Sequence, residues 1–512
     1  MVAKIFGVIP LGVQGILTEI EVYVSGGLPA LNIVGLGDTA VMESRERVRA
    51  AIKNCGFKFP SQRITVNLAP AAIKKEGPGL DLAIAIGILL ATDQIQLHAE
   101  LKEKAVFFGE LSLDGKVKYS FGNLQAAKCA FLKGFAHFFT HYEGCLEAAN
   151  IPGIACYAVN TLRELTMKLA DVSNFKPTSP IPEKKETVQY PLNFGKIKGQ
   201  HAAKRALEIA AAGGHNVLLC GTPGCGKTLL SRAFPSILPE MTLQEKIDVT
   251  EIYSAKGILD CCGQLVRVRP FRAPHHSVSD AALIGGGQIP RPGEVTLSHH
   301  GVLFLDELPE FKKNILELLR QPLSDGIVQI SRARMTMKYP AQFILLSAMN
   351  PCPCGFFGDK KRICVCSPNL IQKYLGKISG PILDRIDMVI HVPRVETELL
   401  LKEVIEESSE KIRARVNNAR KIQTLRLKGL TNPTNSQILS SNLPGYIALD
   451  GAQQNILKMA IDHYQLSARA FDKILKLTLT IMDLEGATQV KNSHLLEAIK
   501  LRTWNPGQSL AA

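Results

Sequence analysis

The chain has 512 residues, a length typical of about three folding units, which excludes a single small module. Hydrophobic residues make up 46% and charged residues 21%, and this composition excludes a chain that is disordered throughout. The chain has 60 lysines and arginines against 46 acids, which gives a net charge of +14. This charge favours polyanionic partners and makes nucleic acid the first candidate. The alternative is that the charge serves only to keep the protein soluble.

The N-terminal sequence does not resemble a secretory signal. It carries one lysine and a short apolar run that is broken by Gly7, Pro10 and Gly12. The longest apolar stretch, residues 82–91, is too short to span a bilayer. Twelve cysteines in so long a chain do not suggest a disulfide framework. These observations predict a cytoplasmic protein with no membrane partner.

Residues 1–170 alternate strand and helix patterns. Strand patterns occur at 20–24, 63–68 and 105–108, and the apolar run at 80–90 predicts a buried helix. This alternation predicts an α+β domain.

The rest of the chain divides into three stretches. Residues 171–190 are rich in proline, serine and lysine, the composition of an exposed linker. Residues 191–393 form a second unit, and 394–512 show a helical pattern with few strand signals. We therefore place the main domain boundary at 171–190.

A glycine-rich loop joins a short apolar strand, 217–220, to a helical segment, 229–234. It fits the GxxxxGKT pattern, in which glycines let backbone N–H groups approach phosphates without Cβ clashes. Lys227 can reach the β- and γ-phosphates, and Thr228 can hold Mg²⁺. The predicted nucleotide-binding residues are Gly221, Thr222, Pro223, Gly224, Cys225, Gly226, Lys227, Thr228 and Leu229.

Two acids follow the next strongly apolar run, 302–305. A phosphate-binding loop needs such an acidic partner at the end of a buried strand. We expect Asp306 to support Mg²⁺ and Glu307 to activate the attacking water, which predicts an ATP hydrolase rather than a kinase. The alternative, a strand that simply ends in two solvated acids, is weakened by the phosphate-binding loop.

Basic residues gather in a predicted hairpin. Strand-like segments at 326–330 and 335–339 enclose Arg332 and Arg334, and Lys338 lies on the second segment. Such residues can follow a phosphate backbone, giving sequence-independent and salt-sensitive DNA binding. The stretch 411–428 holds seven basic residues without an acid, but we interpret it as a solvated helix face.

A third apolar strand, 343–348, ends shortly before Asn350. In open α/β sheets, ligands bind at the carboxyl ends of the strands, so Asn350 can position the attacking water there. An asparagine that only caps the strand is the alternative.

Four cysteines follow this strand in two CxC pairs, Cys352 with Cys354 and Cys364 with Cys366. Four thiolates on one loop suit a closed tetrahedral Zn²⁺ site, although CxC spacing is tighter than the usual CxxC. Four reduced thiols without a metal are the alternative. A metal in this loop, residues 352–366, would stiffen the strand before it.

Together these elements resemble an AAA+ ATPase, in which Asn350 matches the first sensor. The segment 379–387 resembles the one that carries an arginine finger, at Arg385, and Arg469 matches the second sensor. A planar, permanently charged guanidinium suits the charge that develops on the γ-phosphoryl group. The alternatives are an ion pair of Arg385 with Asp384 or Asp387, and a helix-surface position for Arg469. A finger acting on a neighbouring subunit requires an oligomer.

A closer resemblance rests on five blocks that span most of the chain. The blocks 197–206, 271–277, 285–287, 306–311 and 348–355 are similar to the YifB/ComM group of magnesium-chelatase-like proteins. The resemblance implies an α/β fold: an AAA+ P-loop NTPase core with a helical C-terminal lid, preceded by an α+β N-terminal domain.

The resemblance also implies a choice of functions. ComM-type members are implied to be homo-hexameric DNA helicases that drive branch migration during natural transformation, on single-stranded or branched DNA and alongside recombination proteins. Other members are known only as chelatase-like ATPases, for which a protein or metal-insertion partner is the alternative. His275 and His276 recur in the pattern of the group, and the sequence suggests no mechanism for them.

The N-terminal domain is similar to the Lon protease fold, which is ribosomal protein S5 domain 2-like, around residues 74–81 and 109–115. Its chemistry does not follow. Gly79 stands where Lon proteases place the nucleophilic serine, and Leu124 aligns with the general-base lysine. Without a hydroxyl and an amine to activate it, the domain has no mechanism for peptide hydrolysis. We interpret it as a binding or assembly platform.

Overall fold

The computed structural model describes residues 2–35, 37–71, 75, 77–182, 190–259, 263–287, 290–332, 335–359, 361–395, 398, 406–430 and 432–503. Its internal contacts divide the chain into two compact units. The first unit contains Met1–Glu186 and Leu243–Val266, and the second contains Thr187–Thr242 and Arg267–Ala512. The chain therefore passes between the units three times.

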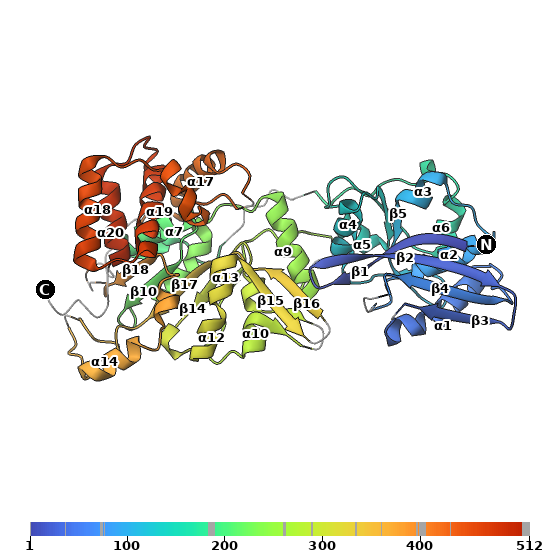
Figure 1. Cartoon of the computed structure of the whole chain (residues 1–512), viewed down its shortest axis with the longest axis horizontal. Helices are drawn as coiled ribbons and strands as arrows, with labels where there is room; N and C mark the ends of the chain where they lie inside the picture. The colour runs from blue at the N-terminus through green and yellow to red at the C-terminus, as the bar shows by residue number, and fades with distance from the viewer. Residues whose placement is uncertain are drawn as a thin grey trace. The chain divides into compact units, whose positions relative to one another are not determined.

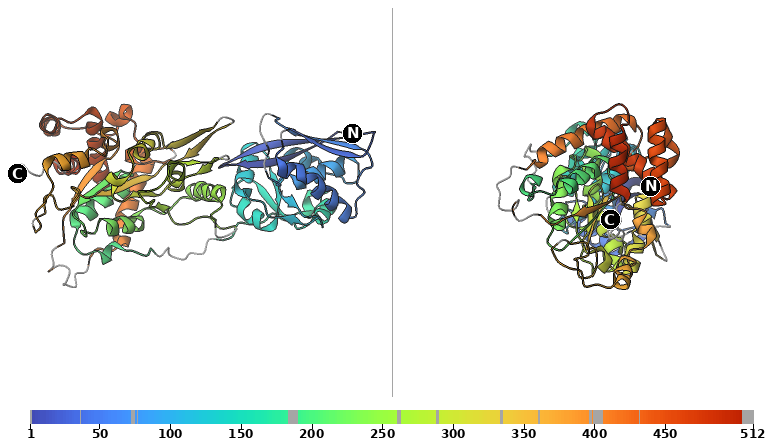
Figure 2. Two further views of the ribbon diagram at one scale, coloured as in Figure 1. Left: turned by 90° about the horizontal axis from the view of Figure 1, so that it is seen from below. Right: turned by 90° about the vertical axis from the view of Figure 1, so that its left-hand side faces the viewer.

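The first unit is built on a seven-stranded mixed sheet with the order β3-β4-β2-β1-β5-β8-β9. Its long strand β1 pairs antiparallel with β2 along the whole length of β1, as the left view of Figure 2 shows. The strands and helices of this unit are β1 Val2–Leu11, β2 Gln14–Ser25, β3 Ala30–Val34, α1 Thr39–Asn54, β4 Arg63–Ala69, α2 Asp81–Ala91, α3 Ala99–Lys104, β5 Ala105–Phe107, β6 Glu110–Leu111, β7 Val117–Lys118, α4 Asn123–Leu132, β8 His137–Thr140, α5 Tyr142–Ala148, β9 Ala155–Ala158, α6 Leu162–Lys168, the 3₁₀ turn η1 Val172–Asn174, and α9 Leu243–Lys256.

Helix α2 forms from the apolar run that predicts a buried helix at 80–90. All but one of its residues are buried, because the run is apolar on every face and packs inside the unit. Its first residue, Asp81, is also buried and accepts a hydrogen bond from Arg47 Nε at 2.7 Å and another from Ser44. Burial raises the pKa of Asp81, and the hydrogen bonds from Arg47 and Ser44 oppose that rise.

Helix α9 comes from the middle of the stretch that the sequence analysis assigns to the second unit. Ile247 is buried in the apolar cluster of the first unit. Lys128 Nζ lies 2.7 Å from Glu251 and 3.1 Å from Asp248, and Gln125 donates to the Glu251 carbonyl at 2.8 Å. Burial raises the pKa of Glu251 to about 7, against the opposing effect of Lys128. Apolar packing, two ion pairs with Lys128 and a hydrogen bond from Gln125 thus hold the helix in the first unit.

The second unit contains a five-stranded sheet with the order β11-β14-β17-β10-β18, in which every neighbouring pair is parallel. Strands β10, β14 and β17 are buried along their whole length, as expected for a parallel sheet covered on both faces. The predicted α/β class with a parallel sheet is therefore confirmed. In a parallel sheet the carboxyl ends of all strands meet at one edge, so the segments that follow β10, β14 and β17 are brought together.

The elements of this unit, shown in Figure 1, are η2 Phe194–Lys196, α7 His201–Gly213, β10 Val217–Gly221, α8 Lys227–Ala233, η3 Phe234–Ile237, β11 Phe271–Arg272, α10 Asp280–Ile284, β12 Gly285–Gly286, β13 Arg291–Pro292, α11 Glu294–Leu297, β14 Val302–Leu305, η4 Leu308–Glu310, α12 Lys313–Leu318, α13 Arg320–Asp325, β15 Ile327–Arg332, β16 Met335–Pro340, β17 Ile344–Met349, α14 Pro368–Leu375, α15 Gly380–Leu383, β18 Met388–Val392, α17 Ser409–Arg426, η5 Asn435–Gln437, η6 Ser440–Gly445, α18 Gly451–Tyr464, α19 Ala468–Glu485 and α20 Asn492–Thr503.

The chain after β18 forms helices, of which α18, α19 and α20 are grouped together in Figure 1. Their apolar residues join one continuous core with those of the sheet and α7, including Leu207, Leu219, Val416 and Leu477. These helices therefore fold as part of the second unit. Among the helices of the described ranges, none combines the length and the apolar composition needed to cross a bilayer.

Candidate functional site

The glycine-rich loop leaves the carboxyl end of β10 and enters α8. Gly224 has φ +76° and Gly226 has φ +96°, a backbone region that side chains disfavour, and a Cβ at either position would meet nothing within 4 Å. The glycines are thus required by the backbone conformation and not by crowding. The open space beside them is what backbone N–H groups need to approach phosphate oxygens.

Lys227 is buried at the centre of this loop. Its Nζ donates to the carbonyl oxygens of Gly221 at 2.7 Å and Thr222 at 3.0 Å, and to Asn350 Oδ1 at 3.1 Å. Asn350 directly follows β17, which lies beside β10 in the sheet. The structure therefore brings together the predicted lysine and the predicted sensor.

Thr228 and Asp306 form the adjoining part of the site. Thr228 Oγ1 donates to Asp306 Oδ2 at 2.8 Å, and Asp306 Oδ1 accepts from the Glu307 backbone N–H at 3.0 Å. A hydroxyl and a carboxylate in contact are oxygen ligands of the kind that Mg²⁺ takes from proteins. Glu307 has φ +52° and its side chain is 59% exposed, so its carboxylate remains accessible to water.

His276 joins the site, although sequence reasoning gave it no role. Its Nδ1 lies 3.6 Å from Glu307 Oε2, and its ring packs edge-on against Phe311. The adjacent His275 bonds instead to Ser277 Oγ at 2.8 Å. His276 follows β11, which pairs parallel with β14 and so ends at the same edge as Glu307, but a two-residue strand leaves almost no signal in the sequence.

Two buried oxygen atoms beside the phosphate-binding loop bear on whether the site fits a nucleotide. Thr222 Oγ1 and Gln200 Oε1 have no hydrogen-bond partner among the described residues. The amide nitrogen of Gln200 donates to the carbonyl oxygens of Cys225 at 3.0 Å and Pro393 at 2.6 Å, which fixes the side chain against the loop. Because buried polar atoms are normally paired, these two oxygens indicate a polar ligand. The residues present fit ATP with Mg²⁺.

Arg385 and Arg469 lie at the opposite edge of the sheet. They line a pocket of about 310 Å³ together with Asn216, which immediately precedes β10, and with Lys473 and Lys476. Asn216 Nδ2 donates to the Arg385 carbonyl at 3.0 Å. A five-residue strand such as β10 spans about 17 Å. The structure therefore does not bring these two arginines to the phosphate-binding loop of their own chain.

The guanidinium of Arg385 is held in place by neutral oxygens. It donates to the Arg320 carbonyl at 3.0 Å, Ser324 Oγ at 2.9 Å and the Pro381 carbonyl at 2.9 Å. Burial and the neighbouring cations Arg469 and Arg320 lower the pKa of Arg385, which still leaves an arginine charged near neutral pH.

The two aspartates considered as ion-pair partners of Arg385 have other contacts. Asp387 lies 2.8 Å from Lys473 and 3.6 Å from His215. Burial favours a raised pKa for Asp387, but the charge of Lys473 outweighs it and holds the pKa far below its usual range. Asp384 lies 3.7 Å from Arg469. Arg385 lines the pocket together with Arg469, Lys473 and Lys476.

The predicted basic hairpin is present as strands β15 and β16, which pair antiparallel with Arg332 opposite Met335. Alternate residues of both strands, including Ile330 and Tyr339, are buried on one face. Lys338 is exposed on the other face, and Arg334 lies outside the described residues. The hairpin is thus anchored along one side and presents a polar side to solvent.

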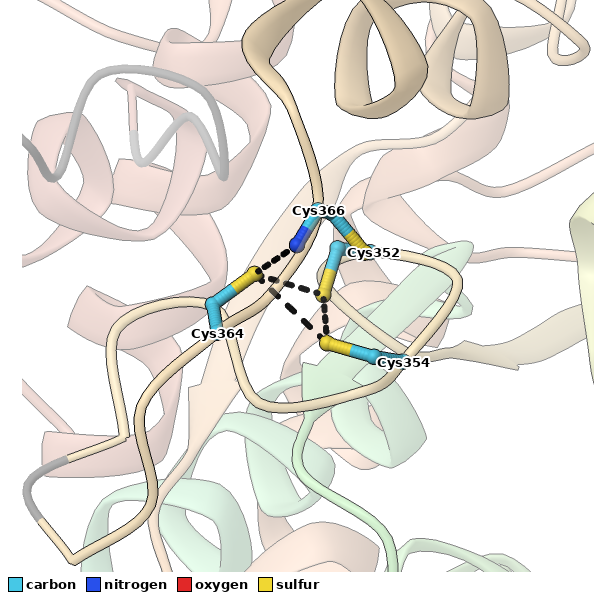
Figure 3. Close-up of side chains that lie close together, drawn as sticks. All are labelled: Cys352, Cys354, Cys364 and Cys366. Atoms are coloured by element: carbon cyan, nitrogen blue, oxygen red, sulfur yellow. Dashed lines mark hydrogen bonds between the residues drawn. The ribbon is translucent and has the colours of Figure 1, made fainter.

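The four cysteines after Asn350 converge, as Figure 3 shows. Their sulfur atoms all lie within 4.8 Å of one another. The measured separations are 3.3 Å for Cys352–Cys354, 3.6 Å for Cys352–Cys364 and 3.5 Å for Cys354–Cys364. The two CxC pairs come from the two ends of one loop, so the chain between them closes back on itself.

Backbone amides surround these thiols. The Phe357 N–H donates to Cys352 Sγ at 3.3 Å, and the Cys366 N–H donates to Cys364 Sγ at 3.4 Å. Burial opposes ionisation of Cys354, but two backbone amides outweigh it and lower the pKa of this thiol to about 6. The loop therefore favours a thiolate at Cys354, the form in which cysteine binds metals, whereas burial raises the pKa of Cys352 to about 12.

Comparison with known proteins gives matches along most of the chain. The family described as magnesium chelatase, subunit ChlI, matches residues 193–400, and its relatives, subunit ChlI of Mg-chelatase and the ChlI C-terminal family, match 20–143 and 406–502. The competence protein ComM of Haemophilus influenzae is 40% identical over 499 residues, which cover 96% of each chain. The YifB proteins of Salmonella typhimurium and Escherichia coli are each 38% identical over 494 residues, covering 96% of this chain and 95% of theirs.

Proposed function

The chain belongs to the YifB/ComM family of magnesium-chelatase-like AAA+ proteins, and from this premise we propose that it is an ATP-driven DNA motor. It acts as a cytoplasmic homo-hexamer that promotes branch migration of incoming DNA during natural transformation, as a ComM-like helicase. The observation that carries the proposal is the convergence of Lys227, Thr228, Asp306 and Asn350 at one sheet edge, with Arg385 fixed at the other.

The residues at the carboxyl edge of the sheet, which we call the first edge, have separate roles in ATP hydrolysis. Lys227 and the loop amides hold the phosphates, while Thr228 and Asp306 hold Mg²⁺. When bound, Mg²⁺ neutralises charge that develops on the phosphates. Glu307 accepts a proton from the attacking water, and Asn350 orients that water. These residues supply the phosphate-binding, metal-binding and proton-transfer groups of a magnesium-dependent ATP hydrolase.

The arginines at the second edge supply what the first edge lacks. Arg385 carries a fixed positive charge, but it stands about one strand length from the loop of its own chain. In a ring this edge faces the nucleotide of the neighbouring subunit, where Arg385 stabilises the charge that develops on the γ-phosphoryl group as it is transferred to water. Arg469 shares the pocket with Arg385, so we assign it to the same neighbouring nucleotide.

The first unit serves binding or assembly and not proteolysis. A Cβ at Gly79 would lie 2.4 Å from Phe108 Cε2, which leaves no room for a serine side chain at the position of the Lon nucleophile. Leu124, at the position of the general-base lysine, is buried and apolar. These two positions therefore supply neither the serine nor the lysine of a Ser-Lys dyad.

The basic hairpin links hydrolysis to DNA. Charge reversal by Arg332→Glu with Arg334→Glu is expected to abolish stimulation of the ATPase by DNA while leaving its basal rate unchanged, because neither arginine is among the residues assigned to ATP binding or hydrolysis. The measurement is the ATPase rate with single-stranded, duplex and four-way-junction DNA at two salt concentrations. Stimulation should be strongest with branched DNA and should fall as salt rises.

The matched control reverses two exposed charges elsewhere, Lys421→Glu with Lys428→Glu, in the stretch interpreted as a solvated helix face. This variant should keep its response to DNA. If DNA leaves the ATPase rate of the unmodified protein unchanged, the DNA motor is refuted. The second candidate, an ATPase that remodels a protein or metal-insertion partner, would then be favoured, since three magnesium chelatase families match the chain.

We also propose that His276 is a positioning residue for Glu307. His276→Ala is expected to lower kcat for ATP about tenfold, because a displaced catalytic group reacts from a poorer position, while the Kd for ATP stays unchanged. His275→Ala is the matched control, since His275 bonds to Ser277 and not to Glu307. Single-turnover hydrolysis and nucleotide titration separate the two constants. Equal losses in both variants, or a loss of ATP binding, would contradict this role.

A further inference from the structure

We infer that Cys352, Cys354, Cys364 and Cys366 form a zinc site, and that this site holds the sensor loop against the phosphate-binding loop. The metal site stands independently of the proposed ATPase. The effect on nucleotide binding rests on that proposed function.

The positions of the sulfur atoms match a tetrahedral metal centre. A Zn–S bond of about 2.3 Å in a regular tetrahedron separates neighbouring sulfur atoms by about 3.8 Å. The measured separations of 3.3, 3.5 and 3.6 Å approach this value and far exceed a disulfide bond of about 2.05 Å. Bringing a fourth sulfur atom within 4.8 Å of the others completes the donor set.

The chemistry of the donors selects the metal. Four sulfur ligands without an oxygen or nitrogen are soft and favour Zn²⁺ over Mg²⁺ or Ca²⁺. The amides of Phe357 and Cys366 donate to two of the thiols, which is the arrangement that stabilises bound thiolates. A set of four protein ligands leaves no open position for water, so the site is structural and takes no part in hydrolysis.

The metal loop lies directly against the nucleotide site. A Cβ at Gly355 would come within 2.6 Å of the Pro223 ring in the phosphate-binding loop. Asn350 stands two residues before Cys352 and accepts a hydrogen bond from Lys227 at 3.1 Å. A metal that ties the ends of the loop, residues 352–366, together therefore fixes two contacts with the phosphate-binding loop at once.

The first test is the metal content of the full-length protein, purified without chelator and measured by elemental analysis. We expect about one zinc per chain, from the tetrahedral thiolate set. Replacing the zinc with Co²⁺ should give the absorption of tetrahedral cobalt thiolate. Cys364→Ser should lose the metal, whereas Cys55→Ala, at a buried cysteine of the first unit, should retain it.

Two glycine substitutions test the coupling without touching a metal ligand. Gly355 and Gly358 both have positive φ, at +85° and +77°, but only Gly355 has a neighbour, Pro223, within 4 Å of a built Cβ. Gly355→Ala should retain zinc and bind a fluorescent ADP analogue about fivefold more weakly, the effect of one lost hydrogen bond. Gly358→Ala carries the same backbone strain and should bind ADP normally.

The outcomes separate the two parts of the inference. Zinc-free protein after growth and purification with added zinc, with all four thiols reactive, would overturn the metal site, and so would iron with inorganic sulfide. Zinc present with equal ADP affinity in both alanine variants would overturn the coupling. Failure of every variant and of the unmodified protein to bind ADP would instead refute the proposed ATPase and leave the zinc measurement standing.

Discussion

Glu307→Gln is expected to lower kcat for ATP hydrolysis by about 10²–10⁴-fold, the contribution of a general base. The amide keeps the size and hydrogen-bonding capacity of the side chain but cannot take the proton from the attacking water. The Kd for ATP should remain close to that of the unmodified protein, because Thr228 and Asp306 are unchanged. Single-turnover hydrolysis with radiolabelled ATP, together with titration of a fluorescent analogue, measures both quantities.

Lys227→Ala is the comparison for this variant. It removes the cation that the loop surrounds and should abolish ATP binding itself. Together the two variants distinguish Lys227, which binds the nucleotide, from Glu307, which activates the attacking water. Near-normal hydrolysis in Glu307→Gln would show that another residue activates the water.

Arg385→Ala is expected to lower kcat by about 10³–10⁵-fold, the range known for arginine fingers, while ATP binding persists. The physical cause is loss of the fixed charge that stabilises the γ-phosphoryl group during its transfer to water. The guanidinium is held by Arg320, Ser324 and Pro381, so the alanine variant loses a positioned charge and not a mobile one. Steady-state ATPase assays with a nucleotide-binding control measure the effect.

Mixing inactive chains tests whether the finger acts between subunits. A Lys227→Ala chain retains Arg385, and an Arg385→Ala chain retains its phosphate-binding loop. If the finger acts on the neighbour, mixed rings should recover part of the activity. A chain that carries both substitutions provides the control and should rescue neither partner. If mixed rings of verified composition recover no ATPase activity, Arg385 acts on the nucleotide of its own chain.

The sequence predicted the edge of the sheet that holds the nucleotide site because its signals are local. Buried parallel strands appear as short apolar runs, and the residue that follows each run must lie at the carboxyl edge. Lys227, Asp306 and Asn350 could therefore be placed together without knowing the strand order. The hairpin at Arg332 was equally local, since its two strands are adjacent in the chain.

Features that depend on long-range packing could not be predicted in this way. His276 reaches Glu307 only because the short strand β11 pairs with β14, and two residues of strand carry almost no periodic signal. Arg469 shares a pocket with Arg385 through the packing of α19 against the start of the sheet. The placement of α9 depends on Lys128, more than a hundred residues away in sequence.

Residues 243–266, which contain α9, belong to the first unit although the chain on both sides of them belongs to the second, and this limits how the chain can be truncated or recombined. A fragment that begins at residue 191 would keep Ile247 and Glu251 but lose the apolar cluster and the lysine that they contact. Such a fragment would expose an unpartnered apolar helix face and invite aggregation. Exchanging the first unit between relatives requires junctions near residues 186, 242 and 266. The two units therefore cannot be exchanged by joining two chains at a single point.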